Sequence, residues 1–245
     1  MLKNKNIIVT GAKKGIGLAI VEKAAKEGAN VWACARSKDN AFEMQMERIA
    51  DDNGVKIEPV YFDLRNENEV KDAVKYIVKE HKAIDSIVNN AGIAYYEKLQ
   101  MMPINKAKEV FDNNYFSSLF FTQLLMRRVT KKTGSIVFIS SIAGFFPEIG
   151  NVAYGGSKLA LSHATQVLSL ELGHEGIRVN SVAPGLVETD MKNMATQEIW
   201  EKLMNRNALQ RSCKPEEVAN VVCFLISDLA SFVNGQTIHV NGGMF

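Results

Sequence analysis

Tyr154 and Lys158 stand four residues apart at the start of a long apolar stretch, which reads NVAYGGSKLAL from Asn151. Residues i and i+4 of a helix share one face, so a helix here would place the two side chains about one turn apart. A free phenol has a pKa of about 10 and is a poor proton donor or acceptor at neutral pH. A neighbouring ammonium group favours the phenolate and would lower that pKa toward the working range. The pair therefore predicts proton transfer at a substrate oxygen, although this spacing also arises by chance.

Two features distinguish Tyr154 from the other five of the six tyrosines. It alone has a lysine four residues later, and it alone follows a serine, Ser141, by thirteen residues in an ISS turn. The Ser141 hydroxyl would orient a substrate oxygen toward the phenol. Ser140 has the same chemistry, and only the spacing selects Ser141. We interpret Gly155 and Gly156 as clearance that lets the reactants approach this helix face.

The elements that would position these side chains alternate along the chain. Short apolar runs are typical of strands, and the amphipathic stretches between them are typical of helices. The expected strands are Ile7–Thr10, Val31–Ala35, Ile57–Phe62, Ile84–Asn89, Ser135–Ser140, Arg178–Val182 and Thr237–Val240. The expected helices cover 16–28, 40–52, 67–80, 104–129, 152–174 and 215–227. This alternation predicts a single-domain α/β Rossmann fold, doubly wound, with a seven-stranded parallel sheet and helices on both faces.

Composition narrows the class of protein. A chain of 245 residues with 47% hydrophobic and 23% charged residues is typical of one soluble globular domain. The net charge of +2, without a long basic block, argues against a nucleic-acid binder. No run approaches the ~18 apolar residues of a membrane span, and no secretion segment is recognisable, so we expect a cytoplasmic protein. Three scattered cysteines fit a reducing compartment, and four histidines without ligand spacing predict no metal site.

The segment from Glu188 to Lys214 breaks the alternation. It is polar and contains methionines, and its helical pattern is weak. It follows a late strand, at the edge of the sheet where ligands bind in open α/β folds. Long excursions at such positions are commonly functional. We therefore expect a substrate lid at about 188–214 within one domain that covers residues 1–245.

The first expected strand ends in a glycine turn, TGAKKGIG, from Thr10 to Gly17, and a helix pattern follows. Glycines let the backbone approach phosphates closely, and the free amides of a helix N-terminus face negative charge. The spacing is G-x-x-x-G-x-G, which differs from the common G-x-G-x-x-G. An ordinary tight turn is the alternative interpretation. The position at the first strand–helix junction favours a site for a dinucleotide pyrophosphate.

The end of the second expected strand bears on which dinucleotide binds. An NAD site places a carboxylate there for the ribose hydroxyls, but this chain has Arg36 and Ser37. A guanidinium offers a fork of donors to a 2′-phosphate, and Lys14 in the glycine turn could supply a second cation. The alternative is that both are solvated surface charges. The missing carboxylate together with two cations favours NADP(H).

These motifs stand in the order found in the short-chain dehydrogenase/reductase family, which the chain resembles over essentially its whole length. The matching segments are the TGxxxGxG turn, NNAG at Asn89–Gly92, the Ser141, Tyr154 and Lys158 set, and PGLVET at Pro184–Thr189. The resemblance implies hydride transfer between NADP(H) and a substrate carbon. The implied catalytic residues are Asn114, Ser141, Tyr154 and Lys158. The expected cofactor-binding residues are Thr10, Gly11, Lys13, Lys14, Gly15, Ile16, Gly17, Arg36, Ser37, Asp63, Leu64, Asn90, Ala91, Gly92, Tyr154, Lys158, Pro184, Gly185, Val187 and Thr189.

The resemblance also implies individual roles. Asp63 would lie beside the adenine, and the PGLVET segment would embrace the nicotinamide carboxamide. Lys158 would also hold the nicotinamide ribose, and Asn114 would help maintain a water-linked proton path to it. Asn113 is the neighbouring alternative, which the spacing to Thr122 and Gln123 disfavours. Tyr95 and Tyr96, after NNAG, either line the substrate cleft or merely cover it.

The last residues, NGQTIHVNGGMF, and the segment VAPGLVETDM resemble bacterial 3-oxoacyl-acyl-carrier-protein reductases. In that subgroup, basic residues near the mouth of the active site hold the acidic carrier protein. Lys132 falls at one such position, but Glu175 stands where the subgroup carries an arginine. A like charge repels an acidic partner, which argues against carrier-protein binding.

The sequence thus predicts an NADPH-dependent oxidoreductase that reduces a ketone to a secondary alcohol. A 3-oxoacyl thioester leads narrowly over another carbonyl or secondary alcohol, such as a sugar, a steroid or a small oxo-compound. A non-catalytic NADPH-binding module is a remote alternative, because all four catalytic residues are present. The resemblance further implies a homotetramer formed through 104–129 and 152–174 with C-terminal contacts.

Overall fold

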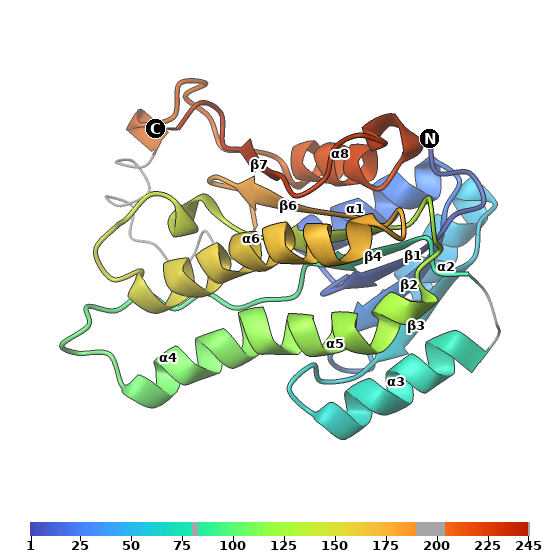
Figure 1. Cartoon of the computed structure of the whole chain (residues 1–245), viewed down its shortest axis with the longest axis horizontal. Coiled ribbons are helices and arrows are strands. Elements are labelled where there is room, and N and C mark those ends of the chain that lie inside the picture. The colour runs from blue at the N-terminus through green and yellow to red at the C-terminus, as the bar shows by residue number, and fades with distance from the viewer. Residues whose placement is uncertain (80–82, 190–203, 245) are drawn as a thin grey trace.

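The computed structural model describes residues 1–79, 83–189 and 204–244. Its strands form one seven-stranded parallel sheet in the order β3-β2-β1-β4-β5-β6-β7 (Figure 1). The strands are β1 (Asn6–Thr10), β2 (Asn30–Ala35), β3 (Ile57–Tyr61), β4 (Ser86–Asn89), β5 (Ser135–Ile139), β6 (Arg178–Pro184) and β7 (Thr237–Val240). The direction of winding reverses between β1 and β4, and the crevice outside the carboxyl ends of the strands at such a point is where ligands bind.

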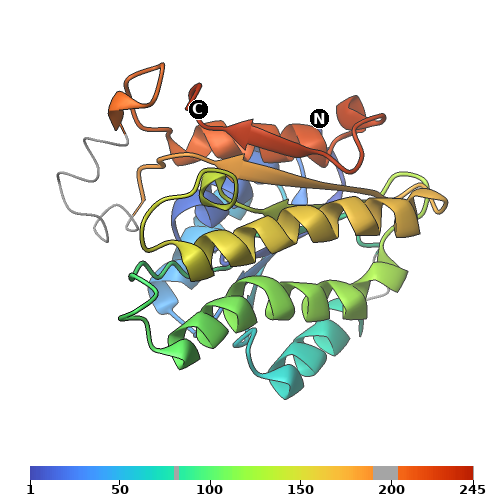
Figure 2. The ribbon, with the colours of Figure 1, turned by 60° about the vertical axis from the view of Figure 1, so that its left-hand side comes forward.

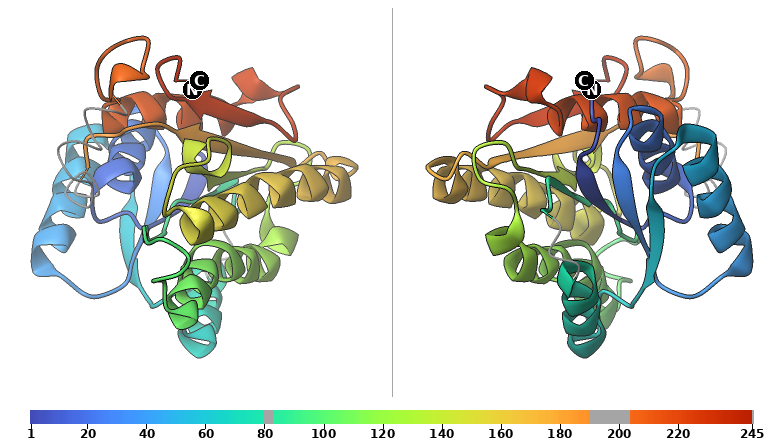
Figure 3. Two further views of the ribbon diagram at one scale, coloured as in Figure 1. Left: turned by 90° about the vertical axis from the view of Figure 1, so that its left-hand side faces the viewer. Right: turned by 90° about the vertical axis from the view of Figure 1, so that its right-hand side faces the viewer.

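Helices cover both faces of the sheet (Figures 2 and 3). The helices that pack on one face are α1 (Gly15–Lys26), α2 (Asn40–Asn53) and α8 (Pro215–Leu225). Those that pack on the other are α3 (Glu67–Lys79), α5 (Ser117–Leu125) and α6 (Val152–Gly173), with α4 (Ile104–Phe111) leading into α5. The two helical layers confirm the expected doubly wound Rossmann fold. The expected strands are also confirmed, except that Ile84 forms only an isolated bridge to Val129.

Two hydrophobic cores explain the continuously apolar strands. Successive side chains of a strand point to opposite faces, and both faces of this sheet are covered. Val9 and Val137 therefore belong to the core under α1 and α8, whereas Ile8 and Ile136 belong to the core under α5 and α6. Every residue of β5 is buried. Burial on both sides holds the carboxyl ends of the central strands in fixed positions.

The helix expected over 104–129 is interrupted by a π-helical turn at Asp112–Phe116. Side chains satisfy the carbonyl groups that the wider turn displaces. Ser117 Oγ donates to the carbonyl oxygen of Asp112 at 2.5 Å, and Asn113 Nδ2 donates to that of Glu109 at 2.8 Å. Such turns are frequent at functional sites, and this one contains Asn114.

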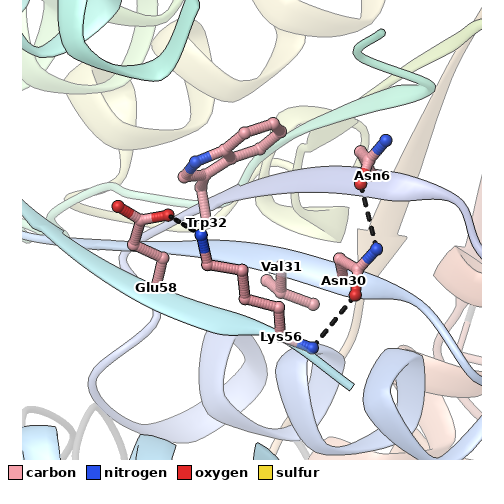
Figure 4. Close-up of a pocket in the computed structure, with 6 residues that line it drawn as sticks. All are labelled: Asn6, Asn30, Val31, Trp32, Lys56 and Glu58. Atoms are coloured by element: carbon pink, nitrogen blue, oxygen red, sulfur yellow. Dashed lines mark hydrogen bonds and ion pairs between the residues drawn. The ribbon is translucent and has the colours of Figure 1, made fainter. Parts of the chain in front are cut away.

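A small cavity lies at the amino ends of the strands, where β1 and β2 begin (Figure 4). Asn30 Nδ2 donates to Asn6 Oδ1 at 3.1 Å, and the backbone N–H of Lys56 donates to Asn30 Oδ1 at 3.0 Å. Its volume of about 10 Å³ leaves room for one water molecule at most. The hydrogen bonds join three strand starts, and we assign the cavity no ligand.

The first glycine turn packs tightly against the end of β4. A Cβ atom at Gly17 would lie 2.1 Å from the carbonyl oxygen of Gly11 and 2.6 Å from Asn90 Nδ2. Both contacts are with groups that the fold holds in place. Only glycine therefore lets α1 begin this close to the turn.

We predict that Gly17→Ala lowers the free energy of unfolding by about 1–3 kcal/mol, because the added methyl group overpacks this contact. Urea unfolding measures the change. The matched control is Gly156→Ala, where a Cβ would lie 3.4 Å from Phe111 Cζ, in ordinary contact. Alanine in that helix interior should raise stability by up to about 1 kcal/mol. Equal losses in the two variants would contradict the tight packing at Gly17.

Candidate active site

Four side chains meet above the carboxyl ends of β4 and β5. Ser141 follows β5 and is the N-cap of the short 3-10 turn Ile142–Gly144. Tyr154 and Lys158 lie in the first turns of α6, and Asn114 comes from the π-helical turn. All four are buried. The fold therefore brings together the residues that the sequence singled out from three separate segments.

The Ser141 side chain lies within hydrogen-bonding reach of the Tyr154 hydroxyl. Ser141 Oγ accepts the backbone N–H of Ala143 at 3.1 Å, which leaves the serine proton for an oxygen on the other side. Tyr154 is only 7% exposed. Burial raises the pKa of Tyr154 above its ordinary value, and the hydrogen bond from Ser141 opposes that rise. The phenol therefore stays protonated at neutral pH.

Lys158 is 4% exposed, and its Nζ donates to the carbonyl oxygen of Ile139 at 2.8 Å. Burial lowers the pKa of Lys158 to about 8. The expectation that Lys158 lowers the pKa of Tyr154 differs from what the structure shows. Desolvation of the buried phenol dominates, and the opposing group is Ser141 rather than the ammonium, which binds the end of β5.

Asn114 uses both ends of its amide. Oδ1 accepts the backbone N–H of Ile93 at 2.8 Å, and Nδ2 donates to the carbonyl oxygen of Ile93 at 2.9 Å and to Ser157 Oγ at 3.0 Å. A Cβ atom at Gly92 would lie 3.0 Å from Asn114 Oδ1 and 3.1 Å from Lys158 Nζ. The NNAG backbone thus lies against both side chains. Asn113, the alternative, bonds only within its own helix in the hydrogen bonds of the described residues.

Two expectations about neighbouring residues are resolved. Ser140 Oγ donates to the carbonyl oxygen of Lys158 at 2.7 Å, so it braces α6 and does not meet Tyr154. The glycines between Tyr154 and Lys158 do not provide clearance for reactants, and that interpretation was wrong. A Cβ at Gly155 would lie 2.4 Å from the carbonyl oxygen of Ala143, and Gly156 faces Phe111. Gly155 instead lets α6 approach the turn after Ser141.

The glycine turn fits a pyrophosphate. Gly11 and Gly15 have φ angles of +65° and +57°, which only glycine adopts without strain. The first turn of α1 contains no acidic residue, and no side chain caps it. Thr10 Oγ1 accepts the backbone N–H groups of Asn90 and Ala91 at 3.0 and 3.1 Å. The open helix terminus and the NNAG turn are therefore held side by side.

The residues expected around the adenosine half lie at the ends of β2 and β3. Arg36 and Ser37 are exposed after β2, and Lys14 is exposed in the glycine turn. Asp63 accepts Arg65 Nη2 at 2.7 Å, and Arg65 lowers the pKa of that carboxyl. Leu64, the next residue, packs on the core under α5. Each of these positions lies at the carboxyl ends of the strands, as the glycine turn does.

Lys13, also expected to bind the cofactor, is paired in the structure. Its Nζ lies 2.5 Å from Asp39 Oδ2. The sequence reasoning did not include Asp39. An aspartate just before the expected helix at 40–52 is a typical N-cap and could have drawn attention to it. The pairing places a carboxylate among the cations expected to meet a phosphate.

The segment after β6 returns to the glycine turn. Pro184 ends β6, and a Cβ at Gly15 would lie 3.1 Å from Thr189 Cγ2. Val187 forms an isolated bridge to Cys213, which joins the two ends of the excursion. Within the expected lid at 188–214, residues 190–203 lie outside the described residues. The lid itself stays a prediction.

Tyr96, left undecided by the sequence, lies against the proposed proton donor. Its ring centroid is 5.5 Å from that of Tyr154, and 49% of its surface is exposed. Tyr95 packs in the same small cluster as Tyr154 and Val110. The backbone N–H of Glu97 donates to the carbonyl oxygen of Gly150 at 2.9 Å and ties this loop to the one before α6. Tyr96 therefore lies against the Tyr154 ring, and Tyr95 packs on the cluster that contains Tyr154.

Lys132 and Glu175 lie together at the amino ends of the strands. The backbone N–H of Lys132 donates to the carbonyl oxygen of Glu175 at 2.9 Å, and Lys131 Nζ lies 3.2 Å from Glu175 Oε2. The two segments precede β5 and β6, whose other ends carry the active site. The expectation that Lys132 borders the active-site mouth is therefore wrong for a single chain, because parallel strands begin at the opposite edge.

The described ranges contain no group of three His, Cys, Asp or Glu side chains that could hold a metal ion. No helix in them is long and apolar enough to cross a membrane. The three cysteines, all within these ranges, are unpaired.

Comparison with known proteins agrees with this geometry. Residues 11–245 match a family model described as enoyl-(acyl carrier protein) reductase. The 3-oxoacyl-(acyl-carrier-protein) reductase FabG of Aquifex aeolicus is 40% identical over 245 residues, which cover 100% of this chain and 98% of that protein.

Two solved structures are similar over 99% of this chain. A short chain dehydrogenase from Burkholderia cenocepacia in complex with NADP has a TM-score of 0.92 at 28% identity, with 98% of that chain covered. A 7α-hydroxysteroid dehydrogenase complexed with NADH and 7-oxo glycochenodeoxycholic acid has a TM-score of 0.90 at 31% identity, with 95% covered. The full-length sequence match, the parallel sheet and the assembled Ser, Tyr, Lys and Asn residues lead to one conclusion: this chain belongs to the short-chain dehydrogenase/reductase family of oxidoreductases.

Proposed function

We propose that this enzyme uses NADPH to reduce the ketone of a 3-oxoacyl thioester to a secondary alcohol. The observation that carries the reaction is the convergence of four buried side chains, Ser141, Tyr154, Lys158 and Asn114, at the carboxyl ends of the strands. Relatives named 3-oxoacyl-(acyl-carrier-protein) reductase, 34–40% identical along the whole chain, support the thioester substrate. A non-catalytic module would not require all four residues to converge.

The chain's own residues fit the cofactor. The open N-terminus of α1 and the Thr10–Gly17 turn would hold the pyrophosphate. Arg36 and Lys14 would hold the 2′-phosphate, Asp63 and Leu64 the adenine, and Pro184–Thr189 the nicotinamide. Bound NADPH supplies a hydride to the carbonyl carbon.

The proton then has to come from the protein. Tyr154 lies close enough to Ser141 for one substrate oxygen to meet both hydroxyl groups. In this proposal Ser141 orients that oxygen, and Tyr154 gives its proton to the developing alkoxide. The raised pKa of Tyr154 keeps the donor protonated for reduction. Ser141 stabilises the phenolate that remains, Lys158 would hold the nicotinamide ribose, and Asn114 positions Lys158 through the Gly92 backbone. The water-linked path through Asn114 stays a prediction.

A bulkier ketone is the second candidate substrate. Exposed apolar side chains gather on the two loops that the Glu97–Gly150 hydrogen bond joins, and these are Tyr96, Leu99, Met101 and Ile149. An apolar rim of this kind favours an apolar substrate. The relative that binds a 7-oxo steroid supports this candidate.

We predict NADPH oxidation with an acetoacetyl thioester and a kcat/KM at least tenfold above that for a steroid ketone or a sugar. Product analysis should show a 3-hydroxyacyl thioester. A crotonyl thioester tests the enoyl reduction that the family description names. Consumption of that substrate, with none of the 3-oxo compound, would contradict carbonyl reduction. Higher kcat/KM with the steroid would replace the first candidate substrate by the second.

Tyr154→Phe removes only the hydroxyl oxygen, and we predict that kcat/KM for reduction falls by about 10²–10⁴ while NADPH still binds. NADPH fluorescence measures the binding separately. Tyr76→Phe, on exposed α3, is the matched control and should keep normal turnover. Turnover that survives in Tyr154→Phe would overturn the assignment of the proton donor.

From the Lys158 pKa of about 8 we predict how the rate of the same reaction depends on pH. The charged lysine is the active form, so kcat/KM for reduction should be level below pH 8 and fall tenfold per pH unit above it. Arginine stays protonated at these pH values. Lys158→Arg should be slower but show no fall near pH 8, and a fall at the same pH would contradict the assignment.

The same pKa has a consequence for folding stability. The pKa falls from 10.5 to about 8 on burial, so between these values the unfolded chain binds more protons than the folded chain. The free energy of unfolding therefore gains a contribution as pH rises from about 8 to 10.5.

We further propose a homotetramer. The outer faces of α4, the π-helical turn and α6 expose apolar side chains, among them Phe116 at 56% and Leu170 at 83%. A hollow beside Phe116 is lined by Ala107, Lys108, Phe111 and Asp112. A second apolar group, Leu229 and Phe232, lies after α8. Two separate apolar faces support two kinds of contact between chains. The unpaired cysteines fit a cytoplasmic location.

We predict that Phe116→Glu converts the tetramer to dimers, because it places a charge in the first of these faces. Light scattering after gel filtration measures the mass. Met44→Glu replaces an exposed side chain on α2, outside both faces, and should leave the tetramer intact. A tetramer that persists in Phe116→Glu would exclude this face as the contact.

A further inference from the structure

Asp39 pairs with a cation of the glycine turn. Lys13 follows β1 and Asp39 follows β2, and these strands are paired with Thr10 opposite Cys34. The ion pair of 2.5 Å between Lys13 and Asp39 thus spans the carboxyl ends of β1 and β2. The adenosine ribose of a dinucleotide binds above these two strand ends. Both side chains remain open to solvent, with 46% and 30% exposure.

Asp39 is a fixed and ionised carboxylate. Its Oδ1 accepts the backbone N–H of Ala41 at 2.9 Å, which makes Asp39 the N-cap of α2. The hydrogen bonds from Lys13 and Ala41 hold the pKa of Asp39 below its ordinary value. The negative charge therefore persists at any pH at which the enzyme works.

Asp39 engages Lys13 of the glycine turn, and the other charges nearby take no part in that pair. Lys38 Nζ lies 3.4 Å from Glu43 Oε1, so that pair is separate. In the part of the chain that the structure describes, Arg36 forms no ion pair, and its field only helps to lower the pKa of Asp63. Arg36 is thus available to a phosphate, whereas Lys13 is held by a carboxylate.

We propose that Asp39 sets the cofactor selectivity of this enzyme by competing with the 2′-phosphate of NADPH for Lys13. To pair with that phosphate, Lys13 must leave Asp39, and the carboxylate then meets the phosphate as a like charge. NADH carries a hydroxyl group there, which a carboxylate can accept as a hydrogen bond. Asp39 therefore moderates the preference for NADPH that Arg36 and Lys14 create. This inference rests on the proposed function, in which NADPH is the reductant.

The ion pair is not needed for folding, which makes a clean test possible. Exposed ion pairs contribute little to stability. Asparagine caps helices as well as aspartate does, so Asp39→Asn keeps the hydrogen bond to Ala41 and removes only the charge. Helix content and thermal unfolding should stay those of the unaltered chain.

The test is a titration of the full chain with NADPH and with NADH, without substrate, followed by nicotinamide fluorescence. In Asp39→Asn we expect the Kd for NADPH to fall about three- to tenfold, as removal of one like charge near a phosphate allows. The Kd for NADH should stay level or rise. The ratio of the Kd for NADH to that for NADPH therefore increases at least about threefold, and the gain shrinks in high salt.

Two controls distinguish the release of Lys13 from a general change in charge. Glu43→Gln removes a carboxylate from the same first turn of α2, but one that pairs with Lys38, and it should leave the ratio unchanged. In a Lys13→Gln background, Asp39→Asn should produce a smaller gain, because no lysine is released.

An unchanged or smaller ratio in Asp39→Asn, with α2 intact and NADPH binding normal, would overturn this inference alone. An equal gain in Glu43→Gln would also overturn it, since charge in general would then be the cause. If the unaltered chain fails to bind NADPH, the proposed function falls, and this inference falls with it.

Discussion

The clamp between Thr10 and Asn90 joins the two strand ends at the switch point, and both halves of the site depend on it. Thr10 Oγ1 accepts two backbone N–H groups of the NNAG turn, and Asn90 Nδ2 donates to the carbonyl oxygen of Thr10 at 3.0 Å. The clamp holds the glycine turn on one side. On the other, it holds Gly92 against Asn114 and Lys158. One set of hydrogen bonds therefore sets the position of the cofactor turn relative to the proton-transfer groups.

Burial governs the chemistry of the polar groups behind this clamp. A buried donor without a partner is costly, and three of the donors here have backbone acceptors. Lys158 binds the Ile139 carbonyl oxygen, Asn114 binds the Ile93 backbone, and Ser140 binds the Lys158 carbonyl oxygen. The same burial moves the pKa values of Tyr154 and Lys158 in opposite directions, because in each case it disfavours the charged form. The result is a neutral phenol next to an ammonium group that loses its proton more easily than a free lysine.

The ion pairs at the rim of the site remain partly open to solvent, unlike the buried polar groups. Lys13, Asp39, Asp63 and Arg65 form exposed pairs that add little to stability. Their importance lies in where they hold charge, at the strand ends where the proposed cofactor phosphate would bind. Asp39 and Arg65 were both absent from the sequence reasoning. Each pairs with a residue, Lys13 or Asp63, that the sequence predicts to bind the cofactor.

The sequence by itself determined the fold and singled out the four side chains that the structure brings together. Strand and helix periods are local properties, and a spacing such as Tyr154 to Lys158 already defines a shared helix face. Contacts between distant segments are not local, so only the tertiary structure decided them. It placed Tyr96 against Tyr154, turned Gly155 toward Ala143, and widened the turn around Asn114. It also placed Lys132 at the amino ends of the strands, away from the site. In a parallel sheet, all strands begin at one end and finish at the other, where the site lies. The direction of each pKa shift depends on burial, and burial exists only once the chain has folded.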